Sequence, residues 1–79
     1  MLTNIDSLKN NLYETFMFIS LDTNSVFQIV FYGEIIAVEH DLVYINQIHF
    51  KSSPKGAKKV ITQTRVLTWG TFKVVRIRR

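Results

Sequence analysis

The spacing of apolar residues divides the chain into a short helical segment and a long strand-rich segment. Near the start, apolar residues recur at helical spacing, at Leu2, Ile5, Leu8 and Leu12. Thr3 or Asn4 can cap this segment, because a side-chain oxygen there can accept a backbone N–H that has no helical partner. The pattern predicts a short amphipathic helix within residues 1–14.

From residue 16 onward, β-branched and aromatic residues dominate, and clusters of turn-forming residues interrupt them. This pattern predicts five strands, over residues 16–21, 26–38, 42–51, 59–68 and 71–77. They are separated by polar turns at 22–25 and 39–41, a loop at 52–57 and a corner at 69–70. Gly33, near the middle of the long second strand, predicts a bulge or a sharp bend.

One helix followed by five consecutive strands predicts a mainly β protein with a single domain, residues 1–79. A bent second strand would let the five strands curl into a small barrel and so remove exposed sheet edges. We therefore expect a short N-terminal helix followed by a five-stranded, strongly bent small β-barrel over residues 16–79.

The small size of the chain limits its stability. A chain of 79 residues buries only roughly 60–65% of its unfolded surface. It contains no cysteine, so neither a disulfide nor a thiolate metal site can supplement the core. Self-association is the remaining way to bury more surface, and we expect a homo-oligomer.

The apolar runs also bear on location. Runs such as residues 16–19 and 35–38 are far too short to span a bilayer. The N-terminus lacks the basic region of a secretory signal. We expect a cytoplasmic protein without a membrane partner.

Charge is distributed very unevenly between the two halves of the chain. Residues 1–41 hold six acids and one lysine, a formal charge of −5, whereas residues 42–79 hold nine bases and no acid, a charge of +9; together they give the net +4. Such asymmetry predicts an anionic partner for the second half. It would equally allow the acidic half of one copy to dock on the basic half of another.

The best candidate site is the basic hairpin between the third and fourth strands. It contains Lys51, Lys55, Lys58 and Lys59, with two serines and a glycine between them. Ammonium groups, hydroxyls and loop N–H groups are the usual contacts to phosphate oxygens. The alternative is a solvated hairpin whose lysines prevent aggregation at a sheet edge.

A second basic cluster ends the chain, and aromatic residues accompany both clusters. Arg76, Arg78 and Arg79 form this cluster, and the planar guanidinium suits phosphate or carboxylate; the alternative is a frayed, solubilising end. Tyr44, Phe50 and Trp69 lie nearest the basic segments and are candidates to stack on bases. Most of the ten aromatic residues must fill the core, and Trp69, at a corner, is the best candidate for exposure.

No catalytic constellation is evident. Glu39, His40 and Asp41 are adjacent on a turn and cannot all converge on one ion. The sequence has no nucleophile elbow, no Gly-rich phosphate loop and no metal-binding pair of histidines. We expect a protein that is not an enzyme and has no cofactor and no metal.

Gly33, Asp41 and Asn46 occur in the order of the first motif of Sm-like proteins, with glycine in strand two, aspartate before strand three and asparagine within it. The chain thus resembles the Sm-like small β-barrels, including the Hfq group, over nearly its whole length. It departs from them at the last corner, where Trp69 precedes Gly70 in place of a basic or polar residue. The resemblance implies an RNA ligand, a role for Asn46 in binding it, and a ring of subunits joined through strands four and five. A generic SH3-like barrel would explain the same pattern.

These observations predict a nucleic-acid-binding small β-barrel that docks electrostatically through the basic hairpin and the C-terminal arginines. RNA is favoured over DNA only through the Sm-like resemblance. One alternative is a small adaptor or inhibitor module that binds an acidic partner protein. Another is a structural subunit that assembles with copies of itself.

Overall fold

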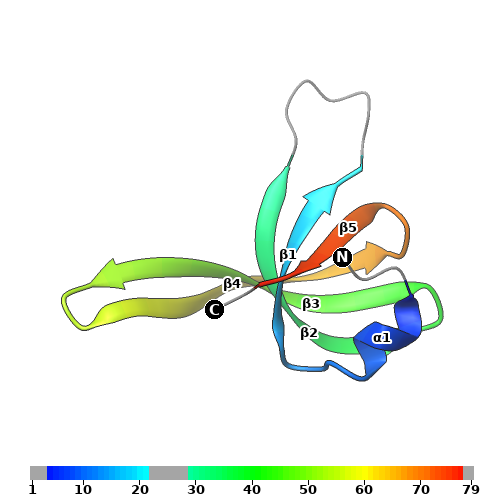
Figure 1. Ribbon diagram of the computed structural model, residues 1–79, viewed down its shortest axis with the longest axis horizontal. Coiled ribbons are helices and arrows are strands. Elements are labelled where there is room, and N and C mark those ends of the chain that lie inside the picture. Colours follow the sequence, from blue (N-terminus) through cyan, green and yellow to red (C-terminus); the bar gives the residue numbers. More distant parts are fainter. Residues whose placement is uncertain (1–3, 22–28, 78–79) are drawn as a thin grey trace.

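The computed structural model describes residues 4–21 and 29–77, which form one short helix and an antiparallel sheet of five strands (Figure 1). The elements are α1 (Ile5–Lys9), β1 (Thr15–Ser20), β2 (Val30–Glu39), β3 (Leu42–Ser53), β4 (Gly56–Thr68) and β5 (Phe72–Arg76). The predicted class, mainly β after an N-terminal helix, is confirmed. The predicted turn at 22–25, the start of the second predicted strand, and Leu2, Thr3, Arg78 and Arg79 lie outside the described residues.

Helix α1 is shorter than the segment 1–14 that the sequence predicts. Asn4 is its N-cap, and the Asn4 side chain accepts a 2.9 Å hydrogen bond from the N–H of Asp6. Leu8 is fully buried and anchors the helix in the core. The helix ends at Lys9 because Asn10 forms the C-cap and Tyr13 adopts a left-handed φ of 69°, which no helix can accommodate.

The sheet has the strand order β4-β3-β2-β1-β5, and every neighbouring pair is antiparallel. Among the described residues β4 and β5 do not pair, so the sheet is not closed into the barrel that the sequence predicts. Strand β5 is only five residues long and pairs with β1 alone among the described strands. The outer part of β4, moreover, follows β3 away from the sheet (Figure 1).

Two irregularities bend the sheet, and neither lies at Gly33. Pairing of β2 with β3 shifts between Ile35 and Ala37, and pairing of β3 with β4 shifts beside Gln47, opposite Thr62. An extra residue on one strand increases local twist and bending. The prediction of a bulge at Gly33 is therefore wrong, since Gly33 pairs regularly with its neighbours on both sides.

Gly33 is required for a different reason, which is close packing. A Cβ atom built at this position would lie 2.9 Å from Ile45 Cδ1 and 3.0 Å from Phe18 Cε2. Both neighbouring side chains are almost completely buried. Because Gly33 has no side chain, Phe18 of β1 and Ile45 of β3 can both pack directly over the backbone of β2.

The core lies on one face of the sheet and beneath α1. Its buried members come from the helix and all five strands: Leu8, Phe16, Phe18, Phe31, Ile35, Val43, Ile45, Leu67 and Val74. Phe31 stacks on Phe18 at 5.4 Å between ring centroids and meets Phe72 edge-on at 5.5 Å. Trp69 is half-buried and packs against this cluster.

Replacing Gly33 with Val should destabilise the protein, because the added atoms overlap two buried side chains that have little room to move. Overpacking of this kind typically lowers the free energy of unfolding by ~1–3 kcal/mol. Chemical denaturation measures this change. Ala37→Val, at an exposed position on the same strand, is the matched control and should stay within about 0.5 kcal/mol of the parent. Equal stability of the Gly33→Val variant and the parent would contradict the packing described.

Replacing Trp69 with Ala should also destabilise the protein, because the indole covers the core at the corner between β4 and β5. Removing a fully buried Trp typically lowers the free energy of unfolding by ~3–5 kcal/mol, and a half-buried one should cost about 2 kcal/mol. Val66→Ala, at an exposed position of β4, should change the same quantity by less than about 1 kcal/mol. A Trp69→Ala variant no less stable than Val66→Ala would show that the indole does not support the core.

Candidate nucleic-acid interface

A two-stranded arm projects from the sheet. Pairing between β2 and β3 extends only to Tyr32↔Ile48 among the described residues, whereas β3 and β4 stay paired as far as Ser53↔Gly56. Residues 49–60, which we call the arm, therefore extend beyond the body of the sheet (Figure 1). Only Pro54 and Lys55 form its turn, so the loop predicted at 52–57 is mostly strand. Gly56 adopts a φ of 112°, a conformation that side chains rarely tolerate.

Three lysines of the arm have no acidic partner in the part of the chain that the structure describes. Lys51 and Lys58 are directly opposite each other in the register, so their side chains share one face of the arm. Lys55 lies in the turn, and all three are exposed. The two ion pairs found among the described residues do not involve them. Because like charges directly opposite each other across two strands repel, an anion beside Lys51 and Lys58 would be stabilising.

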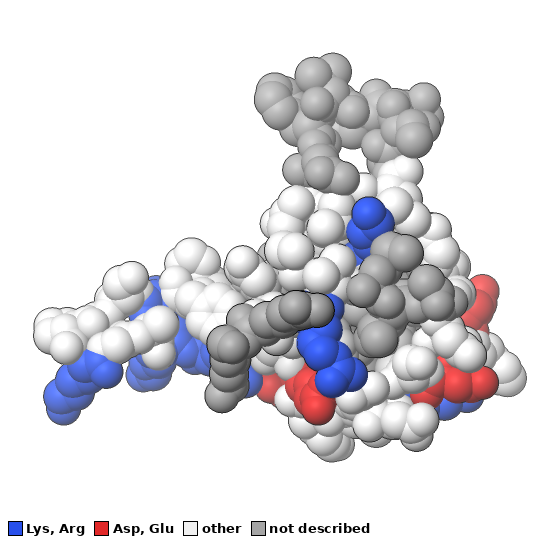
Figure 2. Space-filling view, in the orientation of Figure 1, with Lys and Arg blue, Asp and Glu red and all other residues white. Residues whose placement is uncertain are grey.

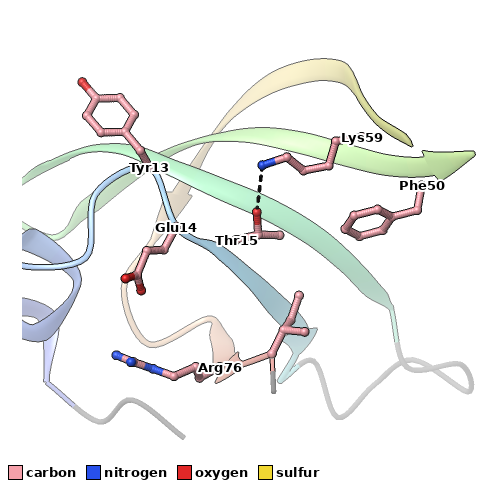
Figure 3. A pocket seen from close by; sticks show the side chains of 7 residues that line it. Tyr13, Glu14, Thr15, Phe50, Lys59 and Arg76 are labelled. Atoms are coloured by element: carbon pink, nitrogen blue, oxygen red, sulfur yellow. Dashed lines mark hydrogen bonds between the residues drawn. The ribbon is translucent and has the colours of Figure 1, made fainter. Parts of the chain in front are cut away.

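Lys59 differs from the other three lysines. Alternation along β4 turns its side chain to the face opposite Lys58. Its ammonium lies 3.2 Å from Glu34 Oε2 and 3.4 Å from Thr15 Oγ1 (Figure 3). The structure thus brings Lys51, Lys55 and Lys58 together on the arm and separates Lys59, whose charge is already matched by an acid.

Surface charge differs between the arm and the body of the sheet. The arm contains lysines and no acid, and Figure 2 shows blue side chains along its lower side. The red side chains lie on the body of the sheet and near α1, away from the tip of the arm (Figure 2). The arm is therefore the part of the molecule that an anionic polymer would approach first.

The remaining predicted residues are spread over the sheet. Trp69 follows the far end of β4, roughly 36 Å along the chain from Lys58 at about 3.3 Å per residue. Tyr44 is half-buried on β3, and Asn46 Oδ1 accepts a 2.9 Å hydrogen bond from Thr64 Oγ1. The structure does not bring these three residues together with the lysines of the arm.

Arg76 lies at the end of β5 and close to the base of the arm. Its Nη2 atom donates a 3.2 Å hydrogen bond to Asn11 Oδ1, and its guanidinium carbon lies 6.0 Å from the centre of the Phe16 ring. Five N–H groups give a guanidinium more donors than these contacts use. Arg76 can therefore also bind a ligand.

A groove of about 580 Å³ occupies the angle between the arm and the body of the sheet. We call this space the groove, and its lining residues are Tyr13, Glu14, Thr15, Phe50, Lys59, Arg76 and Ile77 (Figure 3). Phe50 is fixed by an edge-on contact with Tyr32, with 5.3 Å between the ring centroids. Three of the lining residues, Phe50, Lys59 and Arg76, are among those the sequence predicts for binding.

Sequence reasoning missed Tyr13 and Glu14, which line the same groove. They follow the helix and precede β1, and no motif marks them in the sequence. They reach the groove because the N–H of Tyr13 donates to the carbonyl of Ile35, and the N–H of Ile35 donates to the carbonyl of Glu14. The left-handed φ of Tyr13 marks this segment, but it is a property of the folded backbone that the sequence does not display.

A further polar cluster lies beside the core, on the same face of the sheet, and was also missed. The Arg65 guanidinium lies 4.6 Å from the centre of the Phe31 ring and donates a 3.1 Å hydrogen bond to Gln47. Gln63 donates to the same Gln47 oxygen at 3.1 Å. Arg65 is half-buried and has no acidic partner among the described residues.

Neither a metal cluster nor a membrane span is found in the described part of the chain. Within residues 4–21 and 29–77, no group of three metal-ligating side chains converges, and no helix is long and apolar enough to cross a membrane. The sequence matches no protein-family model, and no curated protein or solved structure shows significant similarity to it.

Proposed function

We propose that this protein is a non-enzymatic nucleic-acid-binding domain that docks on phosphates through the arm. The observation that supports this function best is the group Lys51, Lys55 and Lys58, which are exposed on a projecting hairpin and form no ion pair with an acid among residues 4–21 and 29–77. Each ammonium that meets a phosphate releases a condensed counterion, and this release makes the contact favourable whatever the base sequence.

RNA is the proposed ligand in preference to DNA, and this choice rests on the Sm-like resemblance. The Sm-like resemblance implies a cytoplasmic small β-barrel whose subunits join through strands four and five. Here β4 and β5 are the two edge strands of the sheet, and neither has a second partner among the described strands. We propose that pairing of these edges between copies completes the small-barrel arrangement and makes the protein a homo-oligomer.

The unpaired edges also support a second candidate function, the binding of an acidic protein segment by strand addition. Both edge strands are basic, with Lys58, Lys59 and Arg65 on β4 and Lys73 and Arg76 on β5. An acidic extended segment would pair with either edge and bring opposite charge. A titration with an acidic peptide distinguishes this function from nucleic-acid binding.

Replacing Lys51, Lys55 and Lys58 together with Ala should weaken binding to single-stranded RNA. The slope of log affinity against log salt should fall by about 0.7 for each phosphate that no longer meets an ammonium group. Fluorescence titration at several salt concentrations measures both quantities. Folding should be unaffected, because exposed substitutions typically change stability by no more than about 0.5 kcal/mol.

A single-residue comparison controls for net charge. Lys58→Ala and Lys73→Ala each remove one positive charge from an exposed position, but only Lys58 lies on the arm. The first should lower the salt slope and the second should leave it nearly unchanged. Equal effects of the two variants would show that RNA responds to total charge and not to the arm, and tight binding of an acidic peptide alone would favour the second function.

Self-association through β4 and β5 should strengthen as salt rises, because both edges are basic and their repulsion is screened by ions. Sedimentation at low and high salt, about 50 mM and about 500 mM, tests this expectation. Val66→Lys adds charge to the β4 edge at an exposed position, and it should shift the protein toward monomer without unfolding it. A monomer at every salt concentration would contradict the proposed oligomer.

A further inference from the structure

We propose that the groove binds one unpaired nucleobase of the RNA strand and prefers guanine. This inference rests on the proposed function, because the arm must hold the strand for a base to enter the groove. The groove differs from the arm in charge, shape and polar groups. We therefore assign the phosphates of the RNA to the arm and one base to the groove.

The charge balance of the groove is close to zero. Lys59 is matched by Glu34 at 3.2 Å, which leaves the exposed carboxylate of Glu14 and the guanidinium of Arg76 as the charged lining groups. A carboxylate repels phosphate, so the groove is a poor site for the nucleic-acid backbone. The unpaired lysines of the arm are the better phosphate site, and the groove is left for a neutral group.

The walls of the groove suit a flat aromatic ring. Phe50 lines one end, is 39% exposed and is held by its edge-on contact with Tyr32. Tyr13 also lines the groove, but its ring, 68% exposed, points away from the other lining side chains (Figure 3). Bases stack readily on exposed aromatic side chains of this kind. A volume of about 580 Å³ lies within the ~300–1,000 Å³ range of small-ligand sites.

The conformation of Tyr13 supports a binding role for this end of the groove. A left-handed φ of 69° is costly for a bulky side chain. The backbone bonds that join Tyr13 and Glu14 to Ile35 hold the conformation. The Tyr13 side chain is thus exposed and not buried in the core. Strained residues of this kind concentrate at binding sites.

The polar groups select among the bases. Glu14 has no ion-pair partner among the described residues, and its two carboxylate oxygens can only accept hydrogen bonds. Arg76, on the same groove, can only donate. Guanine matches this pair, because it places two donors, N1–H and the N2 amine, beside the acceptor O6. Adenine and cytosine offer one amine each, and uracil offers none.

The test uses the full protein and short oligouridine RNAs in which only the central base is changed. Replacing the central uracil with guanine should tighten binding about tenfold, within the range typical of a bidentate base contact. Adenine and cytosine should give smaller gains. Inosine, which lacks the N2 amine, should bind more weakly than guanosine. The salt slope should be the same for all of these oligonucleotides, because the phosphates are unchanged.

Two variants connect this preference to the groove. Glu14→Gln places an amide donor against the donors of guanine and should abolish the preference, so that oligouridine and the guanosine-containing RNA bind the variant with equal affinity. Glu39→Gln, at an exposed position at the end of β2 that does not line the groove, is the matched control and should retain the preference. Phe50→Ala should weaken binding to the guanosine-containing RNA about tenfold with an unchanged salt slope.

The outcomes separate the two proposals. Binding of oligouridine with a normal salt slope but no gain from guanine would overturn the groove proposal and leave phosphate docking intact. A guanine preference that survives in Glu14→Gln would also overturn it, because the base would then be recognised elsewhere. No binding to any of the oligonucleotides would overturn both proposals.

Discussion

The close packing of Phe18 and Ile45 across Gly33 is the contact on which the rest of the structure depends. Because β2 carries no side chain at this point, side chains from β1 and β3 meet within a few ångströms over its backbone. The sheet can therefore be tightly packed although the chain is small. Phe18 and Ile45 belong to the core cluster, and the strands cross near the middle of the molecule (Figure 1).

The crossing has two consequences for function. The hairpin of β3 and β4 continues beyond the pairing of β3 with β2, which produces the arm. The end of β5 and the segment before β1 lie beside the base of the arm, which produces the groove. One surface is basic and exposed, whereas the other is aromatic and nearly neutral. A single-stranded nucleic acid offers both of the matching components, a charged backbone and flat bases.

The sequence predicts local features of this molecule well and long-range features poorly. Strand positions follow from alternation and turn residues, so β3, β4 and β5 lie close to their predicted ranges. Gly33 was correctly identified as special, but it serves packing and not a bulge, because contact with Phe18 and Ile45 depends on residues distant in sequence. The prediction of barrel closure was wrong, because whether β4 and β5 pair depends on how strands distant in sequence are arranged in the folded chain. The same contrast applies to the candidate site. The lysines of the hairpin can be located from the sequence. The ion pair of Lys59 and the position of Tyr13 and Glu14 on the same groove as Phe50 are evident only in the folded chain.

The most direct measurement of nucleic-acid binding through the arm is a titration of the isotopically labelled protein with a short single-stranded RNA, followed by amide chemical shifts. Docking through the arm predicts that the largest shift changes occur in residues 49–60, with a second group around the groove at Tyr13, Glu14 and Arg76. Amides beside the core and away from the arm, such as that of Arg65, should change little. Shift changes confined to the exposed edges of β4 and β5, or no changes at stoichiometric RNA, would contradict a phosphate-binding role for the arm.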